Sequence, residues 1–226
     1  MITSADNKSL KLVRRLASAR QRDKLRLFVC EGEDIVAAAR AEGIEPVELL
    51  VAGENVEPRL LADVSTLPHP PRMIGIFRRT DLERRDAPPT GLGLWRVGDP
   101  GNVGSLIRTA DSLGPAFVAL SDACSDPTGP KAVRASMGAL FRVPLIEFDD
   151  APRPWIALVP RGGEDLADVD GATFVLGAER EGLPDEVLAR CDALATIRLA
   201  EGAESLNVAA AGAIALYERA RRRSTA

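Results

Sequence analysis

The sequence predicts an α/β protein in which a small N-terminal unit precedes a larger unit built on a mostly parallel sheet. Its 226 residues are enough for two such units. After Gly91, strand-like apolar runs alternate with helical patterns, which is typical of a parallel sheet covered by helices. Residues 84–91 are rich in arginine and proline and read as a linker. We therefore predict a small α/β unit over residues 1–84 and a larger unit over residues 91–226.

The first element expected is an amphipathic helix over Asn7–Arg20, because Leu10, Val13 and Leu16 recur at helical spacing. Basic residues between them give this helix a cationic outer face. The rest of the small unit is predicted as a strand, a helix and two further strands, with an irregular stretch before the last, over residues 26–30, 31–42, 47–51, 56–71 (irregular) and 73–77.

Six strand candidates follow in the larger unit, at residues 92–97, 116–120, 143–148, 155–159, 172–177 and 194–199. In parallel sheets with covering helices, ligands bind beyond the carboxyl ends of the strands. The loops that follow these strands are therefore the places to look for function.

Composition excludes several classes of protein. A hydrophobic content of 46% includes no apolar run near the roughly 20 residues of a membrane helix. The N-terminus lacks a secretory pattern, so a cytoplasmic location is expected. With one histidine, His69, chemistry that needs a histidine base has little material. The three cysteines are scattered, so neither a disulfide framework nor a metal site is expected.

The net charge of −4 conceals a strongly basic N-terminus. This cluster is either a solvated helix face or a phosphate-binding surface. Its basic residues are Lys8, Lys11, Arg14, Arg15, Arg20, Arg22, Lys24 and Arg26, opposed by Asp6 and Asp23.

The first candidate loop is Gly98–Gly104, which leads into a helix with the apolar face Leu106, Ile107, Ala110 and Leu113. Arg108 lies off that face. Asn102, near the helix start, is placed either to cap the helix or to contact a ligand. The loop is neither a Walker loop nor a dinucleotide fingerprint, because the lysine of the first and the glycine spacing of the second are absent.

Two further loops follow the predicted strands at 172–177 and 194–199. In Gly177–Pro184, paired glycines allow a ligand close to the backbone, and Glu179 is either part of a site or a solvated carboxylate. In the third loop, Ser205 or Asn207 is suited to cap the next helix. That helix begins with the small residues 209–213, so another backbone or a ligand can approach it closely.

Together, in this order and spacing, the three loops resemble the motifs of the SpoU/TrmH family of the SPOUT superfamily, matched by Asn102–Gly114, Gly177–Pro184 and Ile197–Glu218. The stretch 126–144 also resembles that family, and residues 2–32 resemble the ribosomal-protein-like RNA-binding domain often fused to it. The resemblance implies a sheet with a deep trefoil knot, a rare exception among folds. It also implies an RNA 2'-O-ribose methyltransferase that uses S-adenosylmethionine and works as a homodimer, with its active site at the subunit interface.

Individual roles are carried over by the same resemblance. The cofactor would be held by Gly177, Gly182, Ile197, Leu199, Leu206 and Asn207. The catalytic set would be Asn102, Arg108, Glu179, Ser205 and Asn207. RNA would be bound by Lys8, Lys11, Arg14, Arg15, Arg22 and Arg134.

Arg108 matches the family's catalytic arginine, but a guanidinium stays protonated at neutral pH and is a poor base. We interpret Arg108 as a clamp on the target phosphate and the developing alkoxide, while Glu179 or a water takes the proton and Arg134 binds a neighbouring phosphate.

One departure from the family pattern is Ile197-Arg198-Leu199, where the family commonly has Ile-Pro-Met. It is expected to place an extra charge near the cofactor pocket. Ribosomal RNA is the favoured substrate and transfer RNA the alternative. A non-catalytic RNA-binding relative is the main rival, and a dehydrogenase is disfavoured because its glycine fingerprint is absent.

Overall fold

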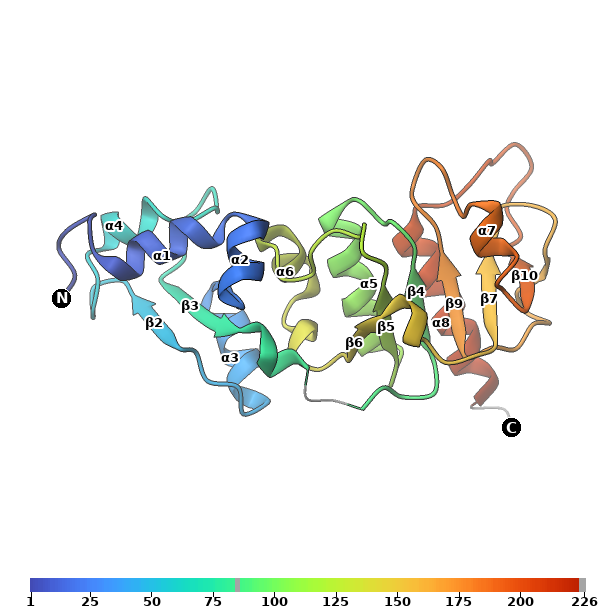
Figure 1. The fold of residues 1–226 in the computed structure, drawn as a ribbon, viewed down its shortest axis with the longest axis horizontal. Coiled ribbons are helices and arrows are strands. Elements are labelled where there is room, and N and C mark those ends of the chain that lie inside the picture. The colour runs from blue at the N-terminus through green and yellow to red at the C-terminus, as the bar shows by residue number, and fades with distance from the viewer. Residues whose placement is uncertain (84–85, 224–226) are drawn as a thin grey trace.

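The computed structural model describes residues 1–83 and 86–223, which form two separate sheets (Figure 1). The first sheet has three strands in the order β1-β3-β2, and the second has seven in the order β6-β5-β4-β9-β7-β10-β8. The predicted linker begins at positions 84–85, which lie outside the described residues. The predicted division into units at residues 84–91 stays a prediction.

In the small unit, β1 and β2 both pair antiparallel with β3. Side chains on alternate faces of these strands enter different cores, because successive residues of a strand point to opposite sides. Val29 packs with α1 and α4, whereas Phe28 and Cys30 pack with α3. The elements are α1 (Lys8–Leu16), α2 (Ala19–Leu25), β1 (Leu27–Glu31), α3 (Glu33–Ala41), β2 (Glu48–Val51), α4 (Pro58–Ala62), β3 (Met73–Arg78) and the 3-10 helix η1 (Arg79–Leu82).

Two predictions for this unit are wrong. The stretch 56–71, expected to be irregular, contains α4. The single helix expected over residues 7–20 is two helices, α1 and α2, which are separated at Ala17 and Ser18. The predicted strands are confirmed with shifted ends.

All strand pairs of the large sheet are parallel, which confirms the predicted α/β class. The strands are β4 (Gly91–Leu94), β5 (Phe117–Leu120), β6 (Leu145–Glu147), β7 (Trp155–Leu158), β8 (Glu164–Asp165), β9 (Thr173–Leu176) and β10 (Ala193–Thr196). Six were predicted, and the two-residue β8 was not. The trefoil knot stays a prediction.

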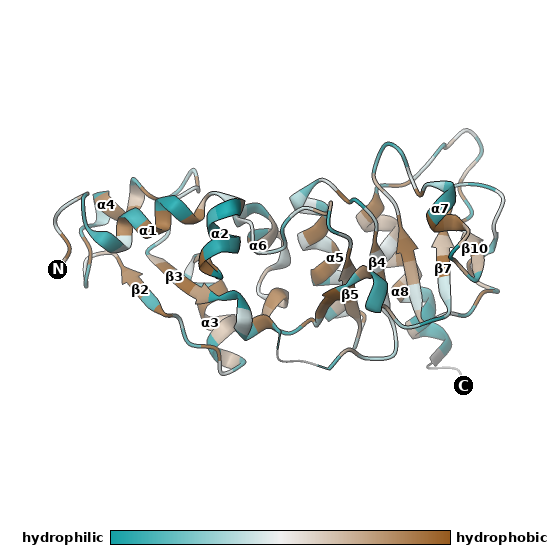
Figure 2. Ribbon diagram, in the orientation of Figure 1, coloured by the Kyte–Doolittle hydropathy of each residue, from teal (hydrophilic) through white to brown (hydrophobic). Residues whose placement is uncertain are grey.

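The helices of this unit cover both faces of the sheet. They are α5 (Pro100–Ser112), α6 (Pro130–Ser136), α7 (Asp185–Leu188) and α8 (Val208–Arg223), with the 3-10 helices η2 (Ala139–Phe141) and η3 (Phe148–Asp150). On one face α5 packs against both α6 and α8. Val187 of α7 and Phe148 of η3 bury side chains of the other face. Figure 2 shows that the apolar residues of α5 and β5 lie inside, while α1 and α2 are largely hydrophilic.

Close approaches of α5 to its neighbours depend on two glycines. A Cβ on Gly104 would lie 2.3 Å from the carbonyl oxygen of Ala132 in α6, and one on Gly212 would lie 2.4 Å from Leu106. The small residues at the start of α8 therefore pack tightly against this chain's own α5.

Strand order in the large sheet brings the candidate loops together. After β4 the chain runs outward through β5 and β6, whereas β9 pairs with β4 on its other side. The loops that follow β4 and β9 therefore meet at the carboxyl ends of two adjacent parallel strands, which is the usual ligand position in such sheets.

An apolar core joins the small unit to the large one. The rings of Phe28 and Phe77 lie 6.2 and 5.4 Å from the ring of Phe141 in η2, measured between centroids. All three side chains are buried and belong to the same core as the residues beneath α5. The position of the small unit is therefore fixed in part by hydrophobic packing.

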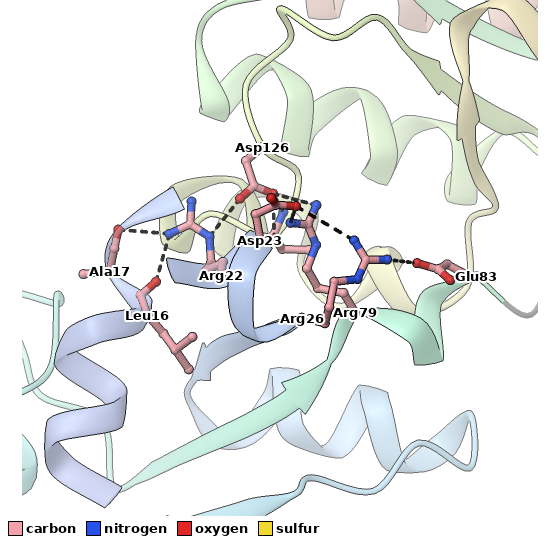
Figure 3. Close-up of polar contacts among 9 residues, drawn as sticks. Leu16, Ala17, Arg22, Asp23, Arg26, Arg79, Glu83 and Asp126 are labelled. Atoms are coloured by element: carbon pink, nitrogen blue, oxygen red, sulfur yellow. Dashed lines mark hydrogen bonds and ion pairs between the residues drawn. The ribbon is translucent and has the colours of Figure 1, made fainter. Parts of the chain in front are cut away.

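Arg22 adds a buried polar link across the same boundary (Figure 3). Arg22 is buried, with only 4% of its surface exposed. Its Nε donates to Asp126 at 2.8 Å, and its Nη1 donates to the carbonyl oxygens of Leu16 and Ala17 at 2.9 Å each. These carbonyls belong to the C-terminal end of α1, where helical partners are missing. The guanidinium thus stabilises the break between α1 and α2.

The prediction that Arg22 binds RNA is therefore wrong, because its guanidinium is buried and pairs with Asp126 inside the protein. Burial raises the pKa of Asp126, but hydrogen bonds from Thr128 and Arg22 and the charge of Arg22 outweigh it and hold the pKa below its usual value. Arg79 lies 3.7 Å from the same carboxylate. The Asp126 carboxyl is therefore ionised at neutral pH.

Arg22→Ala should lower the free energy of unfolding by about 3 kcal/mol, because it removes the closest cation from a largely buried carboxylate and the donor to two helix-end carbonyls. Arg15→Ala, on the exposed face of the neighbouring helix, should change it by less than about 0.5 kcal/mol. Urea denaturation followed by circular dichroism measures both. Equal stability of the two variants would contradict this account of Arg22.

Candidate functional site

The loops after β4 and β9 are joined by the carboxylate of Glu179. Its oxygens accept hydrogen bonds from the backbone N–H groups of Gly98 (3.3 Å) and Asp99 (3.2 Å) and from Nδ2 of Asn102 (2.9 Å). One side chain of the β9 loop thus holds both the β4 loop and the first turn of α5.

Asn102 extends this connection to the third loop. Its Oδ1 accepts a hydrogen bond from Nδ2 of Asn207 at 3.2 Å. Asn207 in turn caps α8, because its Oδ1 accepts from the N–H of Ala209 at 2.8 Å. The side chains of Glu179, Asn102 and Asn207 therefore form a continuous chain, which we call the three-loop link, through all three predicted motifs.

Asp99, which the sequence reasoning missed, fixes the start of α5. Its carboxylate accepts from the N–H of Asn102 at 3.0 Å and pairs with Lys131 Nζ at 2.7 Å. The hydrogen bond from Lys131 lowers the pKa of Asp99, assisted by the Asn102 N–H. The signal was present, since an aspartate directly before a proline is typical of a helix N-cap followed by its first turn.

A pocket of about 660 Å³ opens between the β9 and β10 loops. This volume is in the range of small-molecule sites. Among its lining residues are all those expected to hold the cofactor, Gly177, Gly182, Ile197, Leu199, Leu206 and Asn207, and also Glu179 and Ser205. The sequence reasoning missed further lining residues at the ends of β7 and β9, directly after β7, and in α7 and α8, including Leu158, Val159, Pro160, Leu176, Leu188 and Ala211.

The floor of this pocket depends on the close pairing of two glycines. Ala178 and Gly182 form a β-bridge, and Gly182 has a φ of +68°, a conformation that favours glycine. A Cβ on Gly177 would lie 2.2 Å from the carbonyl carbon of Gly182. The loop therefore cannot keep this shape with a side chain at position 177.

The structure changes the expected role of Glu179. Partial burial raises the pKa of this carboxyl, but the hydrogen bonds from Asn102 and from backbone N–H groups outweigh it, so the pKa lies below its usual value. A carboxylate that is ionised and already accepts several hydrogen bonds is a weak proton acceptor. Its observed contacts are those of a group that holds loops in place.

Arg108 is exposed on α5, as its position off the apolar face predicted. It does not line the pocket. Arg108 lies six residues beyond Asn102, about 9 Å along the helix at 1.5 Å per residue, and on a different side. Within the described part of the chain, its guanidinium has no hydrogen-bond or ion-pair partner. The structure of one chain thus does not bring Arg108 to the other candidate catalytic residues.

The extra charge expected near the pocket points elsewhere. Arg198 Nε pairs with Asp165 of β8 at 2.8 Å. The neighbours Ile197 and Leu199 line the pocket, whereas Arg198 does not. Alternation of side chains along an extended segment explains this difference, so the extra charge lies beside the pocket, between two of its lining residues, but does not line it.

Four of the residues expected to bind RNA, Lys8, Lys11, Arg14 and Arg15, are exposed on α1. The interactions that these side chains make within the chain are weak. Lys11, for example, forms an ion pair with the exposed Asp6 at 3.0 Å. Arg134 is half-buried and donates to Thr66 Oγ1 at 2.8 Å. It therefore lies where α6 meets the small unit.

Within residues 1–83 and 86–223, no helix is both long and apolar enough to cross a membrane. Across the same residues, no group of three or more histidine, cysteine, aspartate or glutamate side chains is arranged to hold a metal ion. Cys30, Cys124 and Cys191 are free, and of these Cys30 is buried.

Gly177→Ala should weaken the binding of S-adenosylmethionine at least tenfold, because the added Cβ forces the β9 loop away from Gly182. Gly98→Ala is the matched control, since a Cβ at Gly98 would meet nothing within 4 Å. Isothermal titration calorimetry measures both affinities, and circular dichroism checks that the fold is kept. Equal affinities for the two variants would contradict the role given to the paired glycines.

Comparisons with known proteins agree with the fold and the pocket described above. The model of the SpoU rRNA Methylase family matches residues 89–217. The 23S rRNA (guanosine(2553)-2'-O)-methyltransferase RlmP of Bacillus subtilis is 27% identical over 96% of this chain and 97% of its own length. An AdoMet-bound rRNA methyltransferase from Sinorhizobium meliloti superposes with a TM-score of 0.86 at 30% identity, covering 98% of this chain and 97% of that one. The SpoU methyltransferase AviRb from Streptomyces viridochromogenes, in complex with AdoMet, gives a TM-score of 0.85 at 25% identity, covering 97% and 99%. The chain belongs to the SpoU rRNA methylase family.

Proposed function

We propose that the chain is an S-adenosylmethionine-dependent methyltransferase that modifies a ribose 2'-oxygen of ribosomal RNA. The observation that carries this proposal is the three-loop link beside the 660 Å³ pocket, in a chain of this family. The 23S rRNA 2'-O-methyltransferases of Bacillus subtilis and Streptomyces viridochromogenes, 27% and 31% identical to it, support ribosomal RNA over transfer RNA.

The pocket fits a ligand with an adenosine and an amino-acid part. Leu176, Leu188 and Leu199 supply apolar walls, and the glycine loop leaves backbone groups open to a ligand. When bound, S-adenosylmethionine supplies an electrophilic methyl group. The residues of the chain then act by position, because in-line attack needs the ribose oxygen held in one orientation.

The 2'-hydroxyl must lose its proton during this attack. With its pKa lowered and its oxygens already accepting several hydrogen bonds, Glu179 is poorly suited to take that proton. We therefore assign proton removal to a water, and assign to Glu179 the placement of Asn102. Arg108 clamps the target phosphate and stabilises the developing alkoxide, as a charged fork can.

We also propose a homodimer in which Arg108 reaches the pocket of the other subunit. Two features support it. Arg108 is exposed and lies away from the pocket of its own chain. Tyr217 of α8, on the helix that packs against α5, is 55% exposed and so offers an aromatic surface to a second subunit.

The function is tested by incubating the protein with methyl-labelled S-adenosylmethionine and unmodified 23S rRNA or transfer RNA transcripts. Label should enter 23S rRNA as a 2'-O-methyl nucleotide. Arg108→Ala should bind the cofactor normally and lose at least about a hundredfold in methyl transfer, as typical for one oxyanion donor. Cofactor binding without transfer to either RNA by the unaltered protein would favour a non-catalytic RNA-binding relative.

Mixing two impaired variants, at a cofactor concentration too low to fill the Gly177→Ala pocket, tests the placement of Arg108. A heterodimer of Arg108→Ala and Gly177→Ala subunits contains one intact site only if Arg108 and the pocket come from different subunits. Recovery of activity on mixing supports the proposed dimer. No recovery, with heterodimers present by mass spectrometry, would contradict it.

A further inference from the structure

Arg96 stands directly before the β4 loop and has an unusual backbone. Its φ is +54°, in the left-handed region that costs free energy for residues with a Cβ. Among the described residues, the other non-glycine positions with positive φ are Arg26 and Met137, the C-caps of α2 and α6, where this conformation is common. Arg96 instead follows a strand, so helix termination does not account for it.

The segment around Arg96 is held rigidly by its neighbours. The N–H of Trp95 donates to the carbonyl oxygen of Leu176 at 2.8 Å, and the N–H of Arg96 donates to Ser121 Oγ at 2.9 Å. Two residues later, the N–H of Gly98 reaches Glu179. Hydrogen bonds from this backbone to the last residue of β9 and to the Ser121 side chain just after β5 thus fix the direction in which the Arg96 side chain leaves the sheet.

The guanidinium of Arg96 is exposed, and no acidic side chain of the described residues neutralises it. Its Cζ lies 5.6 Å from the centroid of the Trp95 ring, a distance at which a cation is attracted to the face of an indole. The Trp95 ring itself is anchored edge-on against Phe148, with centroids 5.2 Å apart. The Arg96 side chain is thus held beside an anchored indole while its charge stays exposed.

Glycine would adopt this φ without strain, whereas arginine adopts it at a cost in free energy. The presence of arginine at this position therefore indicates a role for its side chain. Such outliers are concentrated at functional sites. Trp95 gives a parallel indication, because its Nε1 is buried and has no hydrogen-bond partner among the described residues. A phenylalanine would fill the space without that cost, but tryptophan binds a cation more strongly.

The location fits a contact with RNA. In Figure 1, α1, α2 and the loops that follow β9 and β10 lie along the upper edge of the molecule, with the loop between β4 and α5 between them. RNA that contacts the basic face of α1 and enters the pocket passes over this loop. An arginine is suited to bind a phosphate there, because its planar fork matches phosphate oxygens.

We propose that Arg96 binds a phosphate of the substrate RNA strand and so holds the target ribose against the carboxyl end of the sheet. This inference rests on the proposed function, since it assumes that RNA is the ligand. Arg96 is a positioning residue, distinct from the groups that line the cofactor pocket.

The test compares Arg96→Gly and Arg96→Asn, which both tolerate a positive φ, with Arg40→Gln, which removes an exposed charge from α3 on the opposite edge (Figure 1). Both Arg96 variants should keep normal affinity for S-adenosylmethionine and unfold at the same or a higher urea concentration. Their affinity for unmodified 23S rRNA transcripts should fall about tenfold, with KM raised more than kcat is lowered.

Salt dependence separates a phosphate contact from a structural role. The slope of log K against log salt should become shallower by about 0.7 to 0.9 in both Arg96 variants and remain unchanged in Arg40→Gln. Arg96→Lys should restore the slope but only part of the affinity, because lysine lacks the bidentate fork.

An unchanged slope and RNA affinity in both Arg96 variants would overturn the inference, as would loss of cofactor affinity, which would make Arg96 a support of the loop. Failure of the proposed function is distinguishable, because it would appear as absent methyl transfer in the unaltered protein. The RNA-binding comparison would still decide the role of Arg96, and absent RNA binding by the unaltered protein would overturn both.

Discussion

The carboxylate of Glu179 is the constraint on which the candidate site depends. Three loops that are far apart in the sequence must be held in register at the end of the sheet, and loops have little rigidity of their own. Glu179 reaches two backbone N–H groups and Asn102, and Asn102 reaches Asn207. One ionised side chain thus fixes the start of α5, the wall of the pocket and, through a single intermediate, the start of α8.

This arrangement also explains why the carboxylate is not free for proton transfer. The hydrogen bonds that order the loops are the same ones that lower the pKa of Glu179. A stronger base at this position would need fewer donors, and the loops would then be less ordered. In the proposed mechanism the chemistry is therefore assigned to Arg108 and a water, and the site depends mainly on pre-organisation.

Much of this architecture was predictable because the signals are local. Alternation of strands and helices predicted the parallel sheet, and glycine-rich segments after strands predicted the three loops. The burial of Arg22 was not predictable, because its partner Asp126 is 104 residues away and no local pattern links them. The sequence pattern of a basic helix is the same whether a given arginine faces solvent or a neighbouring unit. The break between α1 and α2 was missed for the same reason, since a tertiary contact satisfies the exposed carbonyls.

In the site, too, some features follow from local sequence signals and others depend on tertiary contacts. Most residues that line the pocket lie in the loops that the sequence singled out, whereas the outward direction of Arg198 depends on β8, a two-residue strand with no periodicity to detect. The separation of Arg108 from the pocket of its own chain depends on how α5 is rotated relative to the pocket, which no local sequence pattern shows. Arg96 gave no sequence signal, because its backbone angle is visible only in the structure.

The most direct measurement of the three-loop link is a double-mutant cycle between Glu179 and Asn102, read out as the dissociation constant of S-adenosylmethionine. Glu179→Gln, Asn102→Ala and the double variant are compared with the unaltered protein. If Glu179 acts on the pocket by holding Asn102, the two substitutions should be non-additive, with a coupling energy of about 1 kcal/mol, within the range seen for residues in one network. Strictly additive effects would contradict the link as the organiser of the site.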